Sequence, residues 1–315
     1  MVKTTSNRVV TSVVVPTYNG SSKVERLLIS LVKQLNETRE LIIVDDGSTD
    51  GSAKSIARLL QHVQNVRLIE KSNGGRSVAR NSGAKEAKGE FIVFIDDDIL
   101  VPPNFLERVE YVQRNFPSSW VTGTVVQDIA DLPYQDFFRF RSKLDYVPKN
   151  LEHSLTGLVE QPFFTTQQLS VQSSIFHEVG GFDEQLTDSE DFELSVRVKF
   201  KGYSILHDVK NVVRHADYSD FDKFIYRQKE YKDSKEALAI ERPEILERYP
   251  DILRSKTRNG FFKSWARRFF VYNRLWKAFF RSDLRMVIPE TVRFKMYDLV
   301  ISSTIFAHSS FKEKL

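Results

Sequence analysis

The sequence predicts an α/β fold in which a mostly parallel sheet is flanked by helices. Short apolar runs, rich in β-branched residues, alternate over the first third of the chain with longer stretches of helical periodicity. Such alternation places successive strands parallel and joins them by right-handed crossovers. Polar residues follow each apolar run directly, and in this class of fold ligands bind where the strands end.

Strands and helices are expected in strict alternation through this region. The expected strands are 9–15, 41–44, 66–69 and 91–95, and the expected helices are about 23–35, 53–60 and 77–87. The first helix is clearly amphipathic, because apolar residues repeat at steps of three and four from Val24 to Leu35. Loops 16–20, 45–51 and 96–103 should then open on the same edge of one sheet.

The last of these strands runs directly into three aspartates, Asp96, Asp97 and Asp98. Three adjacent carboxylates repel one another unless a cation or hydrogen-bond donors compensate them. Mg²⁺ typically takes one or two carboxylates together with substrate phosphates. The residues alone therefore allow two interpretations, a metal–phosphate site and a solvated acidic turn.

Composition indicates a soluble globular protein, with 41% hydrophobic and 28% charged residues among 315. The absence of cysteine excludes disulfides and thiolate metal sites and agrees with a reducing compartment. No uncharged apolar run reaches the ~18 residues of a membrane span. The apolar run 9–15 is too short for the apolar region of a signal peptide. We therefore expect a cytoplasmic protein.

Charge is distributed unevenly, although the net charge is only +4. Residues 254–285 hold ten Lys and Arg, one Asp and nine aromatic residues. Aromatic and basic residues interleave at steps of three and four over 259–281, which predicts one or two basic amphipathic helices. We expect 254–285 to bind an anionic membrane surface, peripherally and on the inner face. The alternative is a helix whose aromatic side packs on the α/β domain.

Two domains are expected. Residues 1–220 form the α/β domain, with a ligand-binding half at about 9–103 and a second half at about 104–220. In the second half, 165–175 is β-prone and should add strands at the mixed edge of the sheet, and a helix should begin at about Asp188. Residues 221–315 form a helical, basic, amphipathic extension, with a helix over 221–240 and a linker marked by Pro243 and Pro250.

Four motifs in this order resemble the family 2 glycosyltransferases of the GT-A fold. They are VVVPTYNG, IIVDDGSTDGS, GGRSVARNSGAKEAKGEFIVFIDDD and GGFDEQLTDSEDFELSVRVKFKG, and together they cover roughly residues 9–215. The resemblance implies a GT-A domain that takes a nucleotide-sugar donor. It also assigns a role to each loop at the strand ends.

The resemblance places the nucleotide on the first two loops and on the helix that precedes the acidic strand. It implies nucleotide contacts by Pro16, Thr17, Tyr18, Asn19, Asp45, Asp46, Gly75, Arg80, Asp96 and Asp97. Asp46 would accept the N3–H of uracil, with Asp45 in support; its alternative role is a cap for the following helix. Glycines such as Gly75 let backbone N–H groups approach phosphates. The alternative role of Arg80 is an ion pair with the aspartates.

The same resemblance implies a divalent metal, Mg²⁺ or Mn²⁺, on the diphosphate. Asp96 and Asp98 match the D-x-D motif, and His215 matches a histidine near the metal. Asp97 fills the middle position, which leaves open which of the three carboxylates touches the ion. Before the resemblance is considered, an isolated histidine such as His215 is more often structural.

On the acceptor side, the resemblance assigns Asp191, the second acid of the pair Glu190 and Asp191, as the catalytic base, with Asp188 as the fallback. A carboxylate would take the proton as a hydroxyl attacks the anomeric carbon. In-line attack inverts the configuration in one step, as in inverting glycosidases. The expected function is therefore an inverting, metal-dependent transferase, most simply one that uses a UDP-sugar and a glycan or lipid-linked acceptor.

Two other functions are weighed against this one. A non-catalytic GT-A-like module would bind a nucleotide or act as a membrane scaffold, but this chain keeps both sets of acids, which argues for catalysis. A nucleotidyltransferase would need an early glycine-rich loop with a trailing lysine, and none is present. We expect no specific nucleic-acid partner, because basic charge without a recognised module binds nucleic acid non-specifically.

Overall fold

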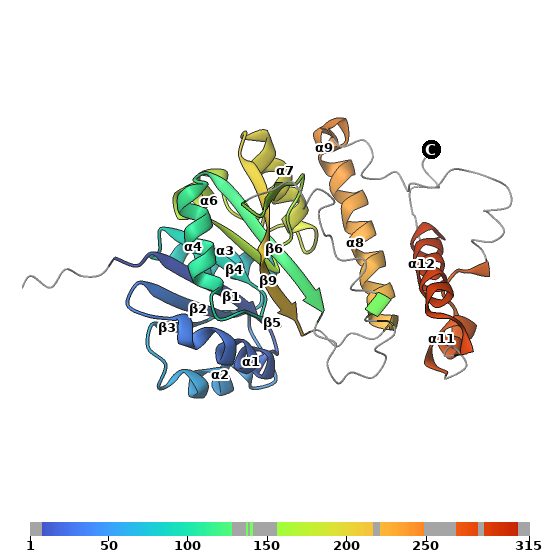
Figure 1. Ribbon diagram of the computed structural model, residues 1–315, viewed down its shortest axis with the longest axis horizontal. Helices are drawn as coiled ribbons and strands as arrows, with labels where there is room; N and C mark the ends of the chain where they lie inside the picture. Colours follow the sequence, from blue (N-terminus) through green and yellow to red (C-terminus); the bar gives the residue numbers. More distant parts are fainter. Residues whose placement is uncertain are drawn as a thin grey trace, which may run out of the picture. The chain divides into compact units, whose positions relative to one another are not determined.

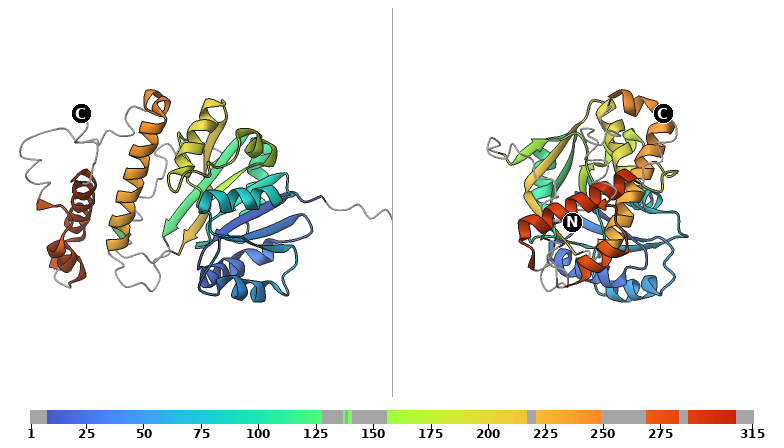
Figure 2. Two further views of the ribbon diagram at one scale, coloured as in Figure 1. Left: turned by 180° about the vertical axis from the view of Figure 1, so that it is seen from behind. Right: turned by 90° about the vertical axis from the view of Figure 1, so that its right-hand side faces the viewer.

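The computed structural model of the chain describes residues 8–127, 137, 139–140, 156–216, 221–248, 269–282 and 287–307. The chain divides into two compact units. The first unit comprises 1–128 and 145–217, and the second comprises 129–144 and 218–315. Figures 1 and 2 show the elements of each unit.

A mixed sheet forms the centre of the first unit. Its strands in chain order are β1 (Thr11–Thr17), β2 (Arg39–Asp45), β3 (Val66–Glu70), β4 (Phe91–Ile95), β5 (Ile99–Leu100), β6 (Ser119–Gln127), β7 (Leu158–Glu160), β8 (Gln168–Gln172) and β9 (Ser204–His215). The spatial order is β3-β2-β1-β4-β8-β6-β9-β5, with β7 paired to β9. The four predicted strands are confirmed and pair in parallel, β2 with β1 and β3, and β1 with β4.

Helices cover both faces of this sheet. They are α1 (Ser21–Leu31), which continues into the short helix η1 (Val32–Gln34), and α2 (Ser52–Leu60), α3 (Arg76–Glu86), α4 (Phe105–Asn115), α6 (Ser173–Val179) and α7 (Glu190–Phe200). Buried side chains of α1, α2 and α4 form one core, and those of α3, α6 and α7 belong to cores on the opposite face. Strand residues alternate between the faces: Val13 and Val15 join the first core, whereas Val14 joins the second.

One part of the sheet differs from the prediction. Residues 168–172 form β8, which lies between β4 and β6 inside the sheet and is antiparallel to both. The expectation that 165–175 lies at an edge is therefore wrong, because β6, β9 and β5 extend the sheet beyond it. The last part of that stretch is helical, since α6 begins at Ser173.

An irregularity in β9 determines where this strand ends. β6 pairs with β9 in two registers, Gly123 opposite Asp208 and then Thr124 opposite Val212, so three residues of β9 bulge out. After the bulge, β9 runs beside β5, and Ile99 pairs with His215. His215 thereby lies next to the loop that carries the three aspartates.

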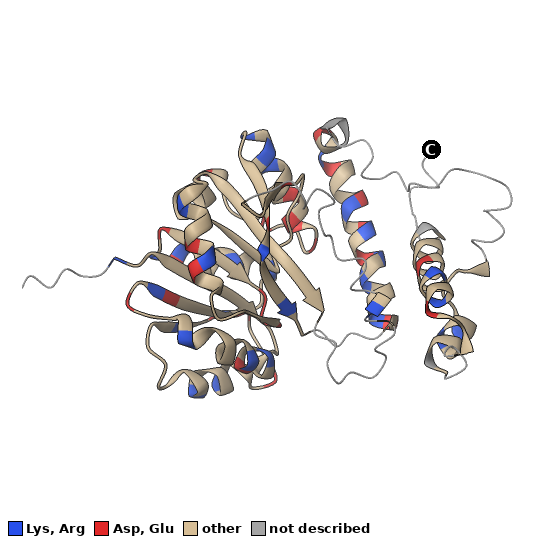
Figure 3. Ribbon diagram, in the orientation of Figure 1, with Lys and Arg blue, Asp and Glu red and all other residues tan. Residues whose placement is uncertain are grey.

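The second unit is helical in the part that the structure describes. It contains α8 (Phe221–Glu241), α9 (Pro243–Arg248), α11 (Arg274–Arg281) and α12 (Glu290–Ala307). Figure 3 shows Lys and Arg alternating with Asp and Glu along α8, so this helix carries both signs of charge. Pro243 begins α9 instead of marking a linker, which agrees with the preference of proline for the first helical position.

An aromatic core joins the helices of this unit. Phe280 of α11 stacks on Tyr297 of α12 with ring centroids 4.3 Å apart, and Phe221 of α8 packs against both rings. The predicted amphipathic helix over 259–281 is thus seen in part, as α11, and its residues before 269 lie outside the described part. Much of its aromatic side packs within its own unit. None of the described helices is both long enough and apolar enough to cross a membrane.

Candidate active site

The loops that follow β1, β2 and β4 meet at one edge of the sheet, as predicted. The backbone N–H of Asp46 donates to the carbonyl of Thr17 over 2.9 Å, and the Thr17 hydroxyl donates to Asp97 over 2.7 Å. The β1 loop is also tied to the β2 loop, because Asn19 Oδ1 accepts from the backbone N–H of Thr49. Asn19 adopts a positive φ of 50°, an uncommon conformation for a residue other than glycine. These contacts bring the predicted nucleotide residues of two loops together.

The four residues of the first predicted nucleotide loop differ in their surroundings. Pro16 and Thr17 are the last residues of β1 and not part of a loop, since Thr17 pairs with Asp45 of β2. Tyr18 follows with about half of its surface exposed. Tyr18 and Asn19 are thus the members of this group that lie beyond the strand.

Asp46 is buried, and its carboxylate holds the loop before α3. It accepts hydrogen bonds from the backbone N–H groups of Gly74 (3.0 Å) and Gly75 (2.8 Å) and pairs with Lys71 Nζ at 2.7 Å. Asp46 does not cap α2. The backbone N–H of Ser52, the first residue of that helix, donates instead to Asp50. Asp45 closes its own turn by accepting from the N–H and hydroxyl of Ser48.

Gly75 directly precedes α3 as its N-cap and has a φ of 88°, a conformation that glycine adopts without strain. A Cβ built on it would meet nothing within 4 Å. The space beside this helix start is therefore open, as the approach of a phosphate would require.

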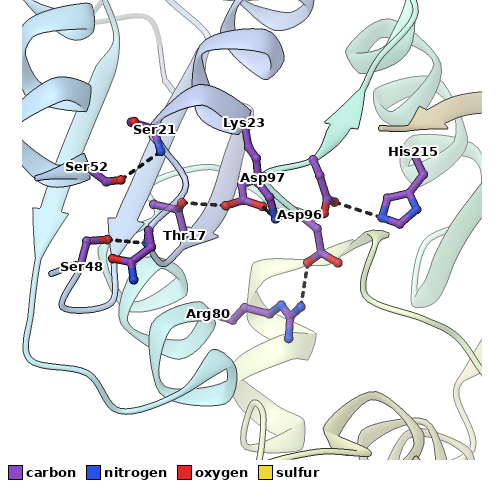
Figure 4. A network of polar contacts seen from close by, with 11 residues as sticks. Thr17, Ser21, Lys23, Ser48, Ser52, Arg80, Asp96, Asp97 and His215 are labelled. Carbon is purple, nitrogen blue, oxygen red and sulfur yellow. Dashed lines mark hydrogen bonds and ion pairs between the residues drawn. The ribbon is translucent and has the colours of Figure 1, made fainter. Parts of the chain in front are cut away.

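Each of the three aspartates has different partners, and Figure 4 shows Asp96 turned to Arg80 and Asp97 turned to Thr17. Asp96 pairs with Arg80 at 2.8 Å. Asp97 accepts from Thr17 through Oδ2, and its Oδ1 lies 3.5 Å from Lys23 Nζ. Asp98 lies 3.4 Å from the same ammonium, and its Oδ1 lies 3.2 Å from His215 Nε2. Arg80, Lys23 and His215 therefore surround the negative charge of the three aspartates.

Their different surroundings shift the pKa values of Asp97 and Asp98 in opposite directions. Burial and the neighbouring charge of Asp98 raise the pKa of Asp97 to about 6, although Lys23 and Thr17 oppose this. Burial would also raise the pKa of Asp98, but His215 and Lys23 outweigh it and lower the pKa to about 2. Both carboxyls are therefore mainly ionised at neutral pH, and Asp98 keeps its charge to a lower pH than Asp97 does.

Arg80 joins the acidic loop to the second half of the domain. Its guanidinium is buried and donates through Nη2 to Asp96 and through Nη1 to Glu190, each over 2.8 Å. Burial opposes the charged form, but these two carboxylates raise the pKa of Arg80 above its ordinary value. The ion pair with Asp96 is the alternative role that the sequence allowed for Arg80. The ion pair with Glu190 is not predicted, because no local sequence pattern signals it.

Glu190 and Asp191, at the start of α7, differ in burial and in their partners. Glu190 is buried against Arg80, whereas Asp191 is partly exposed and accepts from the backbone N–H of Phe192. Asp188 is buried and bonds the N–H of Ser189. Ser189 has a positive φ of 60°, so the backbone is strained where the acids enter the helix.

The model of the family described as "Glycosyl transferase family 2" matches residues 12–182, more than half of the chain. The chain belongs to this family. A glycosyltransferase of Rickettsia prowazekii, RP339, is 24% identical over 266 residues, covering 81% of this chain and 82% of that protein. EpsJ of Bacillus subtilis, also named a glycosyltransferase, is 32% identical over 142 residues, covering 45% of this chain and 38% of EpsJ.

The chain spans only about a third of several of these relatives, for example 30% of a Rickettsia bellii glycosyltransferase, to which it is 27% identical across 66% of its own length. Among solved structures, the mannosyltransferase PcManGT of Pyrobaculum calidifontis, in complex with GDP-Man and Mn²⁺, gives a TM-score of 0.61 at 18% identity, covering 95% of this chain and 86% of that one. GalNAc-T7 with UDP, GalNAc and Mn²⁺ gives 0.55 at 19% identity, covering 68% and 45%. These likenesses confirm the GT-A fold.

The residues present suit a divalent metal bound together with a diphosphate. No group of three or more His, Cys, Asp or Glu within the described ranges could hold an ion unaided. Asp98 and His215 do converge, however, with the buried Asp98 Oδ1 3.2 Å from His215 Nε2. Metals of the Mg²⁺ type use one or two carboxylates and complete their shell with phosphate oxygens and water. Asp96, the other predicted metal ligand, faces Arg80 instead.

Proposed function

We propose that this family 2 glycosyltransferase is an inverting, metal-dependent enzyme that moves a sugar from a UDP-sugar to a hydroxyl of a glycan or lipid-linked acceptor. The observation that carries the proposal is the link from Asp96 through Arg80 to Glu190. It holds one acid of the proposed donor side, Asp96, and one of the proposed acceptor side, Glu190, on the same guanidinium. A non-catalytic binding module would have no need to hold both sets together.

Each group then has a separate task. Tyr18, Asn19 and the open start of α3 at Gly75 would contact the nucleotide, and Asp46 would shape this part through the 71–75 loop or accept from the base. Asp98 and His215 would hold Mg²⁺ or Mn²⁺, which neutralises charge on the leaving diphosphate. Glu190 is occupied by Arg80, so the more exposed Asp191 is the better candidate for the base that takes the proton of the acceptor hydroxyl.

Donor hydrolysis with a panel of UDP-, GDP- and dTDP-sugars, with and without Mn²⁺, tests the proposal. We expect turnover with a UDP-sugar that depends on the metal, and a product of inverted anomeric configuration by NMR. Preferential turnover of a GDP-sugar would replace the donor assignment. Absence of turnover with every donor would favour the non-catalytic nucleotide-binding or scaffold module.

Asp191→Asn tests the base assignment separately. The amide keeps the size of the side chain but cannot accept a proton, so transfer should fall by about 10²–10⁴-fold. Affinity for UDP in the presence of Mn²⁺ should change less than twofold. A matched loss of UDP affinity would remove Asp191 from the base role, and Glu184→Gln, a change of an exposed acid in the same half of the domain, serves as the control.

We also propose that the basic segment 254–285 contacts an anionic membrane surface. Within its described part, Phe269 is 59% and Leu275 is 80% exposed, beside the basic residue Arg274, whereas Lys277 pairs with Asp222. Exposed apolar side chains flanked by Lys and Arg are suited to the headgroup layer. Flotation with phosphatidylserine vesicles should recover the wild type but much less of a Phe269→Asp, Leu275→Asp variant.

The control for this experiment is Ile29→Asp, which changes an exposed apolar residue of the first unit. It should float like the wild type. Equal flotation of the wild type and the double variant would contradict the membrane proposal without affecting the enzymatic one.

A further inference from the structure

Lys23 reaches from the first helix to two of the three aspartates. It lies in the first turn of α1, directly after the predicted nucleotide loop. Its ammonium is shared between Asp97 Oδ1 at 3.5 Å and Asp98 Oδ2 at 3.4 Å. The Lys23 side chain is 44% exposed, whereas those of the two aspartates are 12% and 14% exposed. A partly exposed ammonium thus lies against two nearly buried carboxylates.

The contacts of Lys23 are longer than those that Arg80, Thr17 and His215 make with the three aspartates. Charge-assisted hydrogen bonds are usually about 2.7–2.9 Å long. Arg80 meets this length at Asp96, and so does Thr17 at Asp97. Arg80 is also buried and fixed, whereas lysine is a compact charge on a flexible four-carbon stem. Lys23 is therefore the compensating cation that can leave at the least cost.

A divalent metal on Asp98 would compete with this ammonium. The ammonium and the metal ion would both contact the carboxylate of Asp98. Two cations on one carboxylate repel each other strongly in a partly desolvated site. We propose that Lys23 is a built-in counter-cation: it occupies Asp97 and Asp98 while the metal is absent and is displaced when the metal binds, so that it weakens metal binding. This inference rests on the metal site of the proposed function.

The proposal assigns different roles to the carboxylates on either side of the ammonium. Asp97 remains bonded to Thr17 through Oδ2 and keeps the β1 strand end in place when Lys23 leaves. Asp98 exchanges the Lys23 ammonium for the metal ion. Replacement of Lys23 by a neutral residue should therefore favour the metal without disturbing the contact between the β1 and β4 strand ends.

Titration of the full chain with Mn²⁺ alone, followed by electron paramagnetic resonance of free Mn²⁺, tests the proposal without any measurement of activity. Removal of a partly exposed ion pair of this kind changes an equilibrium by up to about 1 kcal/mol, which corresponds to about fivefold. Lys23→Met and Lys23→Gln should bind Mn²⁺ more tightly than the wild type, by up to about fivefold. Lys23→Arg, which keeps the charge, should bind like the wild type.

The matched control is Lys33→Met, which removes the same charge from the exposed end of the same helical segment. It should leave Mn²⁺ affinity unchanged. Thermal unfolding gives a second readout: Lys23→Met should lower the Tm of the metal-free protein, and saturating Mn²⁺ should raise its Tm by more than it raises that of the wild type.

The possible failures are distinguishable. Mn²⁺ binding to Lys23→Met and Lys23→Gln that is equal to or weaker than binding to the wild type would overturn the role of Lys23 and leave the metal site intact. Binding by none of these proteins would overturn the metal assignment, and this inference with it. An equal gain in affinity in Lys33→Met would mean that only net charge matters, which also contradicts the proposal.

Discussion

Replacement of Arg80 by methionine tests the link between the two halves of the catalytic domain. Methionine fills a similar volume but leaves Glu190 as a buried carboxylate without its cation, since both side chains are at most 5% exposed. Loss of one partner from a buried ion pair typically costs about 3–5 kcal/mol in the free energy of unfolding. Asp96, whose side chain is 28% exposed, can be solvated and should add little to this cost.

The double-mutant cycle with Glu190→Gln separates the pair from general damage. The neutral amide can still accept a hydrogen bond from Arg80, so Glu190→Gln alone should cost only about 1–2 kcal/mol. In the double variant no buried charge is left unpaired. Its total cost should therefore be at least about 1.5 kcal/mol smaller than the sum of the two single costs.

Urea unfolding followed by circular dichroism gives these free energies. Lys199→Met is the matched control: its ion pair with Glu160 lies at the surface, and its removal should cost less than about 1 kcal/mol. The reasoning fails if the costs of Arg80→Met and Glu190→Gln add to within about 0.5 kcal/mol, because independent sites behave in that way. It also fails if Arg80→Met is no more destabilising than Lys199→Met.

Three further predictions concern stability. Gly83→Ala should cost about 1–3 kcal/mol in urea unfolding, because a Cβ there would lie 2.3 Å from Val14; an unchanged midpoint would refute this close approach of α3 to the sheet. Glu110→Gln should cost about 1–3 kcal/mol at pH 7, because Arg39 lowers the pKa of Glu110 despite its burial. A lowered pKa stabilises the fold above the pKa of the unfolded state and ceases to do so as pH falls through the folded value, so the difference from wild type should shrink below about pH 4.5; a difference independent of pH would contradict it. Phe280→Ala should cost about 3–5 kcal/mol by loss of aromatic packing in the second unit, measured by thermal unfolding, and a cost below about 1 kcal/mol would count against that core.

Local periodicity was sufficient to predict the nucleotide-binding half of the fold. Strands β1 to β4 and helices α1 to α3 were predicted to within a few residues, because each carries a pattern that is complete within ten or so residues. The meeting of the loops at one edge also followed, since parallel strands must end on the same side. The position of β8 did not follow, because its antiparallel pairing with β4 and β6 joins segments that are distant in the chain and leaves no local pattern.

The acidic loop shows the same division between local and long-range information. Its position after a buried strand was readable from the sequence, and so were Asp98 and His215 as candidate ligands. The sequence could not show which of the aspartates faces Arg80, or that Lys23 lies between Asp97 and Asp98. Direction of a side chain depends on the backbone at the strand end, and Lys23 is 75 residues away from Asp98.

By itself, then, the sequence determined the fold class, the family motifs and the types of group that gather at the carboxyl edge of the sheet. Tertiary structure decided how these groups pair. The β9 bulge brings His215 to Asp98, and Arg80 reaches across 110 residues to Glu190. Hydrophobic patterns repeat locally and can be read along the chain, whereas a charge pair forms only where sheet register and helix packing bring its two partners together.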